Sequence, residues 1–194
     1  LQKNRNLEFQ KQSEIMITEI MSSNSLTILD GFGSSSDWIE FYNPGDEVIN
    51  LKDAGLSTNF DDPMMWVFPN FEIGPGEYQI VYASGSGTVD DSGNLHSNFR
   101  LNADLGETLY FTSALGTLMS TLEIPPLDSD IAYGLDQAGT WLFYNHPTPN
   151  QKNGLDGQET PDFKVLIESP LKITEYMINN QFTLADEDGD FIDW

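Results

Sequence analysis

Acidic residues near the end of the chain have the types and spacing best suited to binding a cation. Carboxylates at alternate positions around Gly189 can surround a hard ion such as Ca²⁺ with oxygen ligands. An EF-hand loop starting at this point would need glycine at its sixth position, where the chain has Phe191. The candidate calcium ligands are Asp186, Asp188, Asp190 and Asp193. The alternative is a solvated acidic turn between two strands.

Other polar groups give weaker indications of a site. The lesser cation candidates are Asp61-Asp62 and Asp90-Asp91 with Asn94. Ser84–Gly87 lacks the Gly-x-Ser-x-Gly pattern of a nucleophile elbow. His96 and His146 stand alone in expected loops, so we expect a structural hydrogen bond for each. With 2 histidines and no cysteine, the chain also has too few ligands for a zinc site. We therefore expect no catalytic residues and no required cofactor, with calcium as the candidate ion.

Two glutamates lie inside runs of apolar residues. Glu19 falls within Ile15–Met21, and Glu40 falls within Trp38–Tyr42. A carboxylate in such surroundings needs hydrogen bonds or a cation. For Glu19 we favour the alternative that it points outward, as the polar half of an alternating strand.

The elements that would position these groups are β-strands. Short runs of β-branched and aromatic residues stand between clusters of Gly, Pro, Asn and Asp. Asn43–Asp46 and Gly74–Glu77 fit type II turns, and 113–116 and 136–139 fit hairpin loops. No window shows a sustained helical period, which favours an all-β sandwich. The expected strands are 15–21, 38–42, 65–68, 78–83, 108–112, 117–123, 130–134 and 140–144.

Composition limits the classes of partner. The chain has 8 Lys and Arg against 31 Asp and Glu, for a formal charge of −23. This charge repels nucleic acid and anionic membranes, so we expect neither as a partner. No apolar run approaches the roughly 18 residues of a membrane-spanning helix, so we expect no membrane insertion. With 39% hydrophobic residues, the chain can still bury a core.

The chain begins to repeat itself after 156 positions. In that register Ile17-Thr18-Glu19 meets Ile173-Thr174-Glu175, and Asp37-Trp38 meets Asp193-Trp194. The sequence therefore predicts one module and the start of a second. The expected parts are an N-terminal arm (1–13), a β-sandwich domain (14–153), a linker (154–170) and a truncated second repeat (171–194). We expect residues 171–177 to pair with an exposed sheet edge.

An ordered series of motifs spans the proposed domain. It consists of Ile17–Met21, Asp37–Asn43, Trp66–Pro69, Ile73–Tyr78, His96–Leu101, Gly106–Leu109 and Pro147–Asn150. Over residues 14–153 this series resembles the bacterial lamin-tail domain, a module first described at the end of nuclear lamins. The resemblance implies an immunoglobulin-like antiparallel β-sandwich. It also implies a secreted or surface protein in which the module stands beside other domains and is not itself catalytic.

Aromatic residues admit two interpretations. Trp38, Trp66 and Trp141 lie in strand-like runs, and we expect them to be core anchors between two sheets. Trp141–Tyr144 and Met64–Trp66 are also candidates for a sugar-stacking platform, although core packing is favoured. We therefore expect an extracellular, non-catalytic spacer, anchoring or protein-interaction module within a larger tandem-domain protein. The alternative is a carbohydrate-binding accessory module of a secreted or surface hydrolase, with a polysaccharide as partner.

Overall fold

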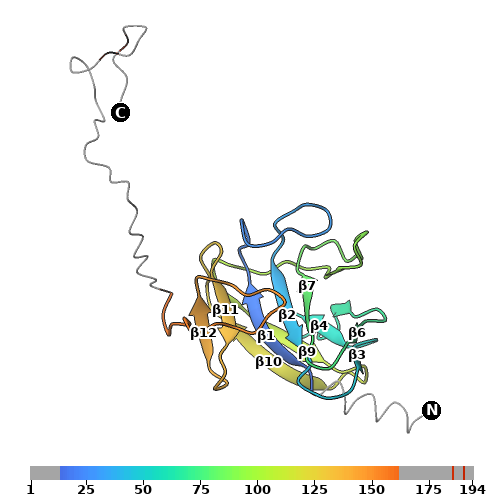
Figure 1. Ribbon diagram of the computed structural model, residues 1–194. Coiled ribbons are helices and arrows are strands. Elements are labelled where there is room, and N and C mark those ends of the chain that lie inside the picture. The colour runs from blue at the N-terminus through green and yellow to red at the C-terminus, as the bar shows by residue number, and fades with distance from the viewer. Residues whose placement is uncertain (1–13, 162–184, 186–189, 191–194) are drawn as a thin grey trace. The chain divides into compact units, whose positions relative to one another are not determined.

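The computed structural model describes residues 14–161, 185 and 190 (Figure 1). Every regular element among them is a β-strand. The strands are β1 (Met16–Met21), β2 (Trp38–Tyr42), β3 (Ile49–Asn50), β4 (Gly55–Ser57), β5 (Trp66–Val67), β6 (Glu72–Ile73), β7 (Tyr78–Tyr82), β8 (Leu95–His96), β9 (Glu107–Thr112), β10 (Leu118–Ile124), β11 (Ala132–Leu135) and β12 (Trp141–Tyr144).

Two sheets form the framework, and a short ribbon joins them. The six-stranded sheet has the order β12-β11-β1-β2-β7-β8, and the four-stranded sheet has the order β10-β9-β4-β5. The ribbon consists of β3 and β6. All neighbours pair antiparallel except β7 and β8, which are parallel. The predicted immunoglobulin-like antiparallel β-sandwich is confirmed, with this one parallel pair as an addition.

The main core lies between the two sheets. Figure 1 shows β9 and β10 crossing behind β1 and β2. Phe41 on β2 packs with Phe68 and with Phe111 on β9, at ring-centroid distances of 5.5 and 5.8 Å. All three rings are buried. Burying a phenylalanine ring contributes about 1.5–3 kcal/mol, so this aromatic contact is a substantial part of the attraction between the sheets.

The tryptophans are not all placed as expected. Trp66 is buried in the core between the sheets, as predicted. Trp38 is fully buried, but it belongs to a second cluster on the other face of the six-stranded sheet, because alternation along β2 turns Ile39 and Phe41 to the first face. Trp141 is only half-buried and stacks on Tyr133 at 5.2 Å.

The turns confirm two expectations and correct another. Gly76 has φ of 70° and the Glu77 amide donates to the Gly74 carbonyl at 3.1 Å, which fits the predicted type II turn. The hairpin loops at 113–116 and 136–139 join β9 to β10 and β11 to β12. The type II turn predicted at Asn43–Asp46 is wrong, because Gly45 has no positive φ. The Asn43 side chain instead accepts the Gly45 amide at 2.9 Å.

The described sandwich continues beyond Asn153. The amide and carbonyl of Gln158 pair with those of Phe143, both at 2.9 Å, within the segment expected to be a linker. The chain divides into two compact units, Leu1–Phe163 and Lys164–Trp194. The predicted N-terminal arm lies outside the described residues, as does the predicted pairing of 171–177. The second repeat is described only at Ala185 and Asp190, and it stays a prediction.

Candidate functional site: a groove beside a buried carboxyl pair

The outer face of the six-stranded sheet, which points away from the four-stranded sheet, carries both apolar and ionisable residues. Its apolar part is a cluster formed by Met21, Trp38, Ile80, Tyr82, Ala132 and Tyr144. Alternation along β2 places Glu40 and Tyr42 on the same face as Trp38. This face therefore combines a buried apolar cluster with polar side chains.

Glu19 and Glu40 lie opposite each other on β1 and β2 and are both fully buried. The prediction that Glu19 points outward is right about the face of the sheet but wrong about exposure to solvent, because Glu19 lies beside Glu40 on the outer face and is fully buried there. A bulge in β1 between Ile17 and Glu19 shifts the register, and the hydrogen bonds that a buried carboxylate needs come from elsewhere in the fold. The Thr148 amide donates to both oxygens of Glu19, at 3.2 and 3.1 Å. Thr18 Oγ1 donates to Glu40 at 2.7 Å, and the Asn150 amide donates to it at 2.6 Å.

Burial changes the acidity of this pair. Desolvation and then the nearby Glu40 charge raise the pKa of Glu19 to about 8. Desolvation alone raises the pKa of Glu40 to about 7, against the hydrogen bonds that lower it. Two carboxyls so close together do not both ionise readily in a buried site. The pair therefore holds a proton near neutral pH.

One loop, residues 145–157, covers the pair, and we call it the strap loop. The Phe143–Gln158 bridge ties its two ends together. Asn153 anchors its middle by donating to the carbonyls of Thr18 and Leu135, at 2.9 and 3.0 Å. The Asn153 side chain also accepts the Thr148 hydroxyl at 2.9 Å. Two sets of hydrogen bonds therefore hold the strap loop on the sheet. Its Asn153 side chain donates to backbone carbonyls, and its Thr148 and Asn150 amides donate to the two carboxyls.

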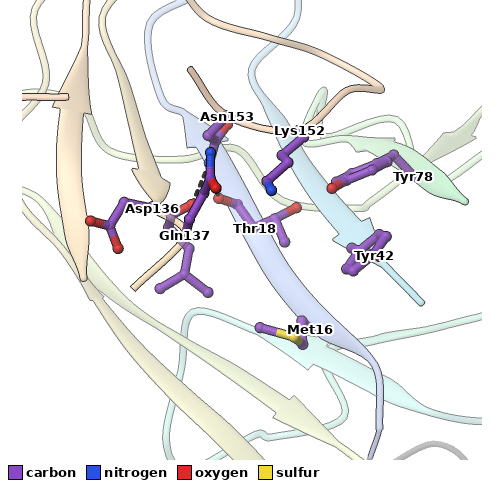
Figure 2. A pocket seen from close by; sticks show the side chains of 9 residues that line it. Met16, Thr18, Tyr42, Tyr78, Asp136, Gln137, Lys152 and Asn153 are labelled. Atoms are coloured by element: carbon purple, nitrogen blue, oxygen red, sulfur yellow. Dashed lines mark hydrogen bonds between the residues drawn. The ribbon is translucent and has the colours of Figure 1, made fainter. Parts of the chain in front are cut away.

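A groove opens beside the strap loop (Figure 2). Its cavity is about 120 Å³. The lining residues are Met16, Thr18, Tyr42, Tyr78, Leu135, Asp136, Gln137, Lys152 and Asn153. Tyr42 on β2 and Tyr78 on β7 stack at 4.3 Å with their planes 23° apart. Both rings are half-buried, so they present a flat apolar surface at the edge of the cavity.

The groove carries charge of both signs. Lys152, from the strap loop, is exposed, and Asp136, from the β11–β12 hairpin, is half-buried. Asp136 Oδ1 accepts the amides of Ala138 and Thr140, at 2.8 and 2.7 Å. Gln137 adds an exposed amide side chain. A ligand here meets an aromatic surface, a cation and amide groups, which is a combination suited to binding.

A second polar network joins Ser84, Asp90 and His96 near the other end of the sheet. His96 Nδ1 lies 2.9 Å from Ser84 Oγ, and Nε2 lies 3.2 Å from Asp90 Oδ2. The expectation of an isolated loop histidine is wrong, because His96 is buried on β8 and packs between Phe32 and Tyr82. It does have the structural hydrogen bonds predicted for it. His146 is exposed, and its Nδ1 lies 2.8 Å from Asp156 Oδ2.

This network has the residue types of a catalytic triad, but its bonds organise loops. Asp90 also accepts the amides of Gly31, Ser92 and Asn94, at 2.8, 2.8 and 3.0 Å. The Asn94 side chain donates to it at 2.8 Å. Desolvation acts to raise the pKa of Asp90, but these hydrogen bonds together outweigh it and hold the pKa below its usual value. Asp90 is therefore a loop anchor whose oxygens accept several hydrogen bonds.

The remaining predicted site residues are not brought together in the described structure. Asp186, Asp188 and Asp193 lie outside the described residues, and Asp190 is exposed. Asp61 and Asp62 are exposed as well. Among residues 14–161, 185 and 190, no group of three or more His, Cys, Asp or Glu side chains is arranged to hold a metal ion. The calcium site stays a prediction.

The two predicted aromatic platforms are largely packed into the fold. Trp66, Phe143 and Tyr144 are buried, and Trp141 covers Tyr133. The aromatic pair that lines the groove, half-buried, is Tyr42 and Tyr78 instead, and sequence reasoning did not single it out. Alternation along 38–42 would have placed Tyr42 beside Glu40, but nothing in the sequence reports the stacking partner on β7 or the Lys152 side chain from the strap loop.

The fold and the outer face together define an immunoglobulin-like β-sandwich with a groove on one sheet. The lamin tail domain family model matches residues 9–126, and the chain belongs to this family. This is a family of non-catalytic, immunoglobulin-like domains with structural and interaction roles. None of the curated proteins compared with the chain matches it. The match ends before β11, so the strap loop and one wall of the groove lie beyond it.

The part of the chain that the structure describes contains no helix long and apolar enough to cross a membrane.

Proposed function

We propose that the chain is a non-catalytic interaction module whose groove docks a segment of a partner protein or of a neighbouring domain. The stacked Tyr42–Tyr78 pair at the edge of the 120 Å³ cavity carries this proposal. Aromatic side chains supply much of the binding energy of protein interfaces, especially next to a cavity that takes an anchor residue. Lys152 and Asp136 at the same cavity provide charge pairing for orientation.

The chemistry of the partner follows from charge. The chain carries −23 at neutral pH, so a basic docking segment is favoured in diffusion and an acidic one is repelled. The cavity is small enough for one aliphatic or aromatic side chain. We infer an extended, basic segment with one apolar anchor residue.

A peptide selection with matched variants tests this proposal. Random 12-residue peptides are selected on the protein, and the affinities of the selected peptides are measured by calorimetry for Tyr78→Ala and Phe60→Ala. Phe60 is also an exposed aromatic residue, but it packs against Tyr110 away from the groove. We expect about tenfold or greater loss for Tyr78→Ala and little change for Phe60→Ala. Equal affinities in both variants would contradict the proposal.

Carbohydrate binding is the second candidate function. Flat tyrosine rings beside the Gln137 amide and the Asp136 carboxylate fit the apolar face and the hydroxyls of a sugar. Affinity electrophoresis in gels containing soluble polysaccharides distinguishes this candidate from a peptide-binding role. Retardation of the wild type that is lost in Tyr78→Ala supports sugar binding, and unchanged migration in a broad polysaccharide panel opposes it.

The cellular setting is part of the same proposal. We infer a secreted or surface protein in which this module acts as a spacer or anchor between other domains of a tandem chain. The acidic composition and the 156-residue sequence repeat support this setting. Fractionation of cells that produce the full-length protein tests it, since recovery from the cytoplasm alone would oppose an extracellular role.

A further inference from the structure

The buried carboxyl pair and the groove share structural parts. Thr18 lines the groove and donates to Glu40, and Asn153 lines the groove and anchors the strap loop. Lys152, next to Asn153, supplies the wall that faces solvent. Any movement of the strap loop away from Glu19 and Glu40 therefore changes the shape of the groove.

The pair has no cationic partner among residues 14–161. Neither carboxyl forms a salt bridge there, and the donors to them are hydroxyl and amide groups. The titratable or charged groups of the surrounding elements are Asp156 and Lys152 on the strap loop, Asp136 on the β11–β12 hairpin, and the tyrosines Tyr42, Tyr78 and Tyr144. Asp156 adds a further negative charge near Glu19, and it is itself bonded to His146.

We propose that a proton shared by Glu19 and Glu40 keeps the strap loop seated on the sheet, and that loss of this proton opens the wall of the groove. The regulation rests on the proposed binding function of that groove. With one proton, the pair carries a single negative charge that the Thr148 and Asn150 amides and the Thr18 hydroxyl solvate. With none, two adjacent negative charges lie in a buried site, and only entry of water relieves them.

Water can reach the pair most readily by displacement of the strap loop. The strands β1 and β2 are central in the six-stranded sheet, and the face below them packs on the main core. On the outer face, the backbone of Thr148 and Asn150 contacts the carboxyls directly. Asn150 has φ of 62°, a conformation that asparagine tolerates and that turns its amide toward Glu40. Lifting this short segment exposes the pair without breaking a strand pairing.

Amide hydrogen exchange measured by NMR between pH 5 and 9 tests the proposal on the intact protein. After correction for intrinsic exchange, we expect the protection of the Thr148 and Asn150 amides to fall between pH 5 and 8, by up to about tenfold per pH unit for each proton released on opening. Amides of β9, such as that of Phe111, should keep their protection over the same range. Constant protection of Thr148 and Asn150 would overturn the proposal.

Two variants and a control test the shared proton. Glu40→Gln removes the repulsion felt by Glu19 and so lowers its folded-state pKa, so the loss of protection at Thr148 should be smaller and should level off at lower pH in this variant. Glu19→Gln/Glu40→Gln should abolish the pH dependence. The exposed Glu123→Gln on β10 should behave as the wild type. An unchanged pH dependence in the double variant would overturn the proposal.

A direct titration covers the case in which the variants do not fold. The side-chain carboxyl ¹³C shifts of Glu19 and Glu40 in the wild type should show one group titrating above pH 7, and titration of both below pH 5 would overturn the proposal. These readouts use no binding partner, so they stand or fail separately from groove binding. Loss of the proposed binding function would appear instead as equal affinities of Tyr78→Ala and wild type at a fixed pH.

Discussion

The Thr18 hydroxyl donates to Glu40 at 2.7 Å, and this one bond connects the groove to the buried carboxyl pair. Thr18 is a buried residue of β1 whose side chain also lines the groove. Glu40 faces it from β2 and is completely shielded from solvent. A polar link of this kind in a sheet interior makes the stability of the domain depend on the ionisation of side chains that lie beside the proposed binding site.

Stability should decrease as pH rises above about 5. The folded-state pKa values of Glu19 and Glu40, about 8 and about 7, exceed the ordinary value of 4.5. The two protonated carboxyls therefore contribute fully to the free energy of unfolding below pH 4.5, and this contribution is lost as pH rises from 4.5 to about 8. The free energy of unfolding falls by at most about 1.4 kcal/mol per pH unit for each proton. Urea unfolding at several pH values measures this slope.

Two features of the same titration serve as controls. Hydrogen bonds lower the pKa of Asp30 and Asp130, so their contribution is lost below the ordinary value of 3.8 and stability should also fall in strong acid. Desolvation raises the pKa of Asp37 to about 6. A variant without the two glutamates should therefore still lose some stability as pH rises toward 6, with a smaller slope than the wild type. Glu19→Gln/Glu40→Gln should flatten the curve above pH 6. A slope there equal to that of the wild type would contradict the assignment.

Removing the Asn153 side chain should destabilise the domain. This buried amide donates two hydrogen bonds and accepts one, so Asn153→Ala leaves the carbonyls of Thr18 and Leu135 without their donor. We expect a loss of about 2–3 kcal/mol in the free energy of unfolding. Gln151→Ala, at an exposed position of the same loop, should change it by less than about 0.5 kcal/mol. Urea denaturation measures the free energy of unfolding of both variants, and equal values for Asn153→Ala and Gln151→Ala would contradict the anchoring role of Asn153.

Two glycines with similar backbone conformations should respond differently to alanine. Gly106 and Gly116 have φ of 67° and 73°. A Cβ at Gly106 would overlap the Ile124 carbonyl oxygen and lie 2.9 Å from the Pro125 carbonyl carbon, whereas one at Gly116 meets nothing within 4 Å. We expect Gly116→Ala to cost about 1 kcal/mol and Gly106→Ala about 3 kcal/mol or more. Thermal melting compares the two, and similar midpoints would contradict this packing argument.

Calcium binding should depend on the terminal aspartates if they form the predicted site. Calorimetric titration with CaCl₂ should give a binding heat that is lost in Asp186→Asn/Asp188→Asn. Asp61→Asn/Asp62→Asn, which removes the same charge from an exposed acidic pair in the sandwich, should retain it. Absence of any binding heat at millimolar calcium, or equal binding heats in both variants, would contradict the predicted calcium site.

The strand pattern of the fold could be predicted from the sequence where runs were long enough to alternate. Ile15–Met21, Trp38–Tyr42 and Tyr78–Ala83 correspond to β1, β2 and β7. The strands β3, β4, β6 and β8 were not predicted, because two or three residues are too few to show a period of two. They form through their neighbours, as β8 does beside β7 inside a glycine-rich segment that resembles a loop.

The candidate site was much less predictable than the fold. The sequence indicated that Glu19 and Glu40 needed partners, and it contained the Pro147–Asn150 motif, but nothing in it indicated that the backbone of this motif supplies them. The bulge in β1 that places both Thr18 and Glu19 on the outer face is also not visible in the residue pattern. The groove depends on residues distant in sequence, so only the folded arrangement brings Tyr42, Tyr78 and Lys152 together.

The Phe143–Gln158 bridge has a consequence for truncated versions of the protein. A fragment stopped at residue 126, where the family match ends, would lose β11, β12 and the strap loop. β1 would then become an unpaired edge strand that can pair with strands of other molecules. Glu19 and Glu40 would be exposed to water and would ionise near pH 4.5. We therefore expect that a fragment must extend at least to Gln158 to keep every strand pairing of the sandwich.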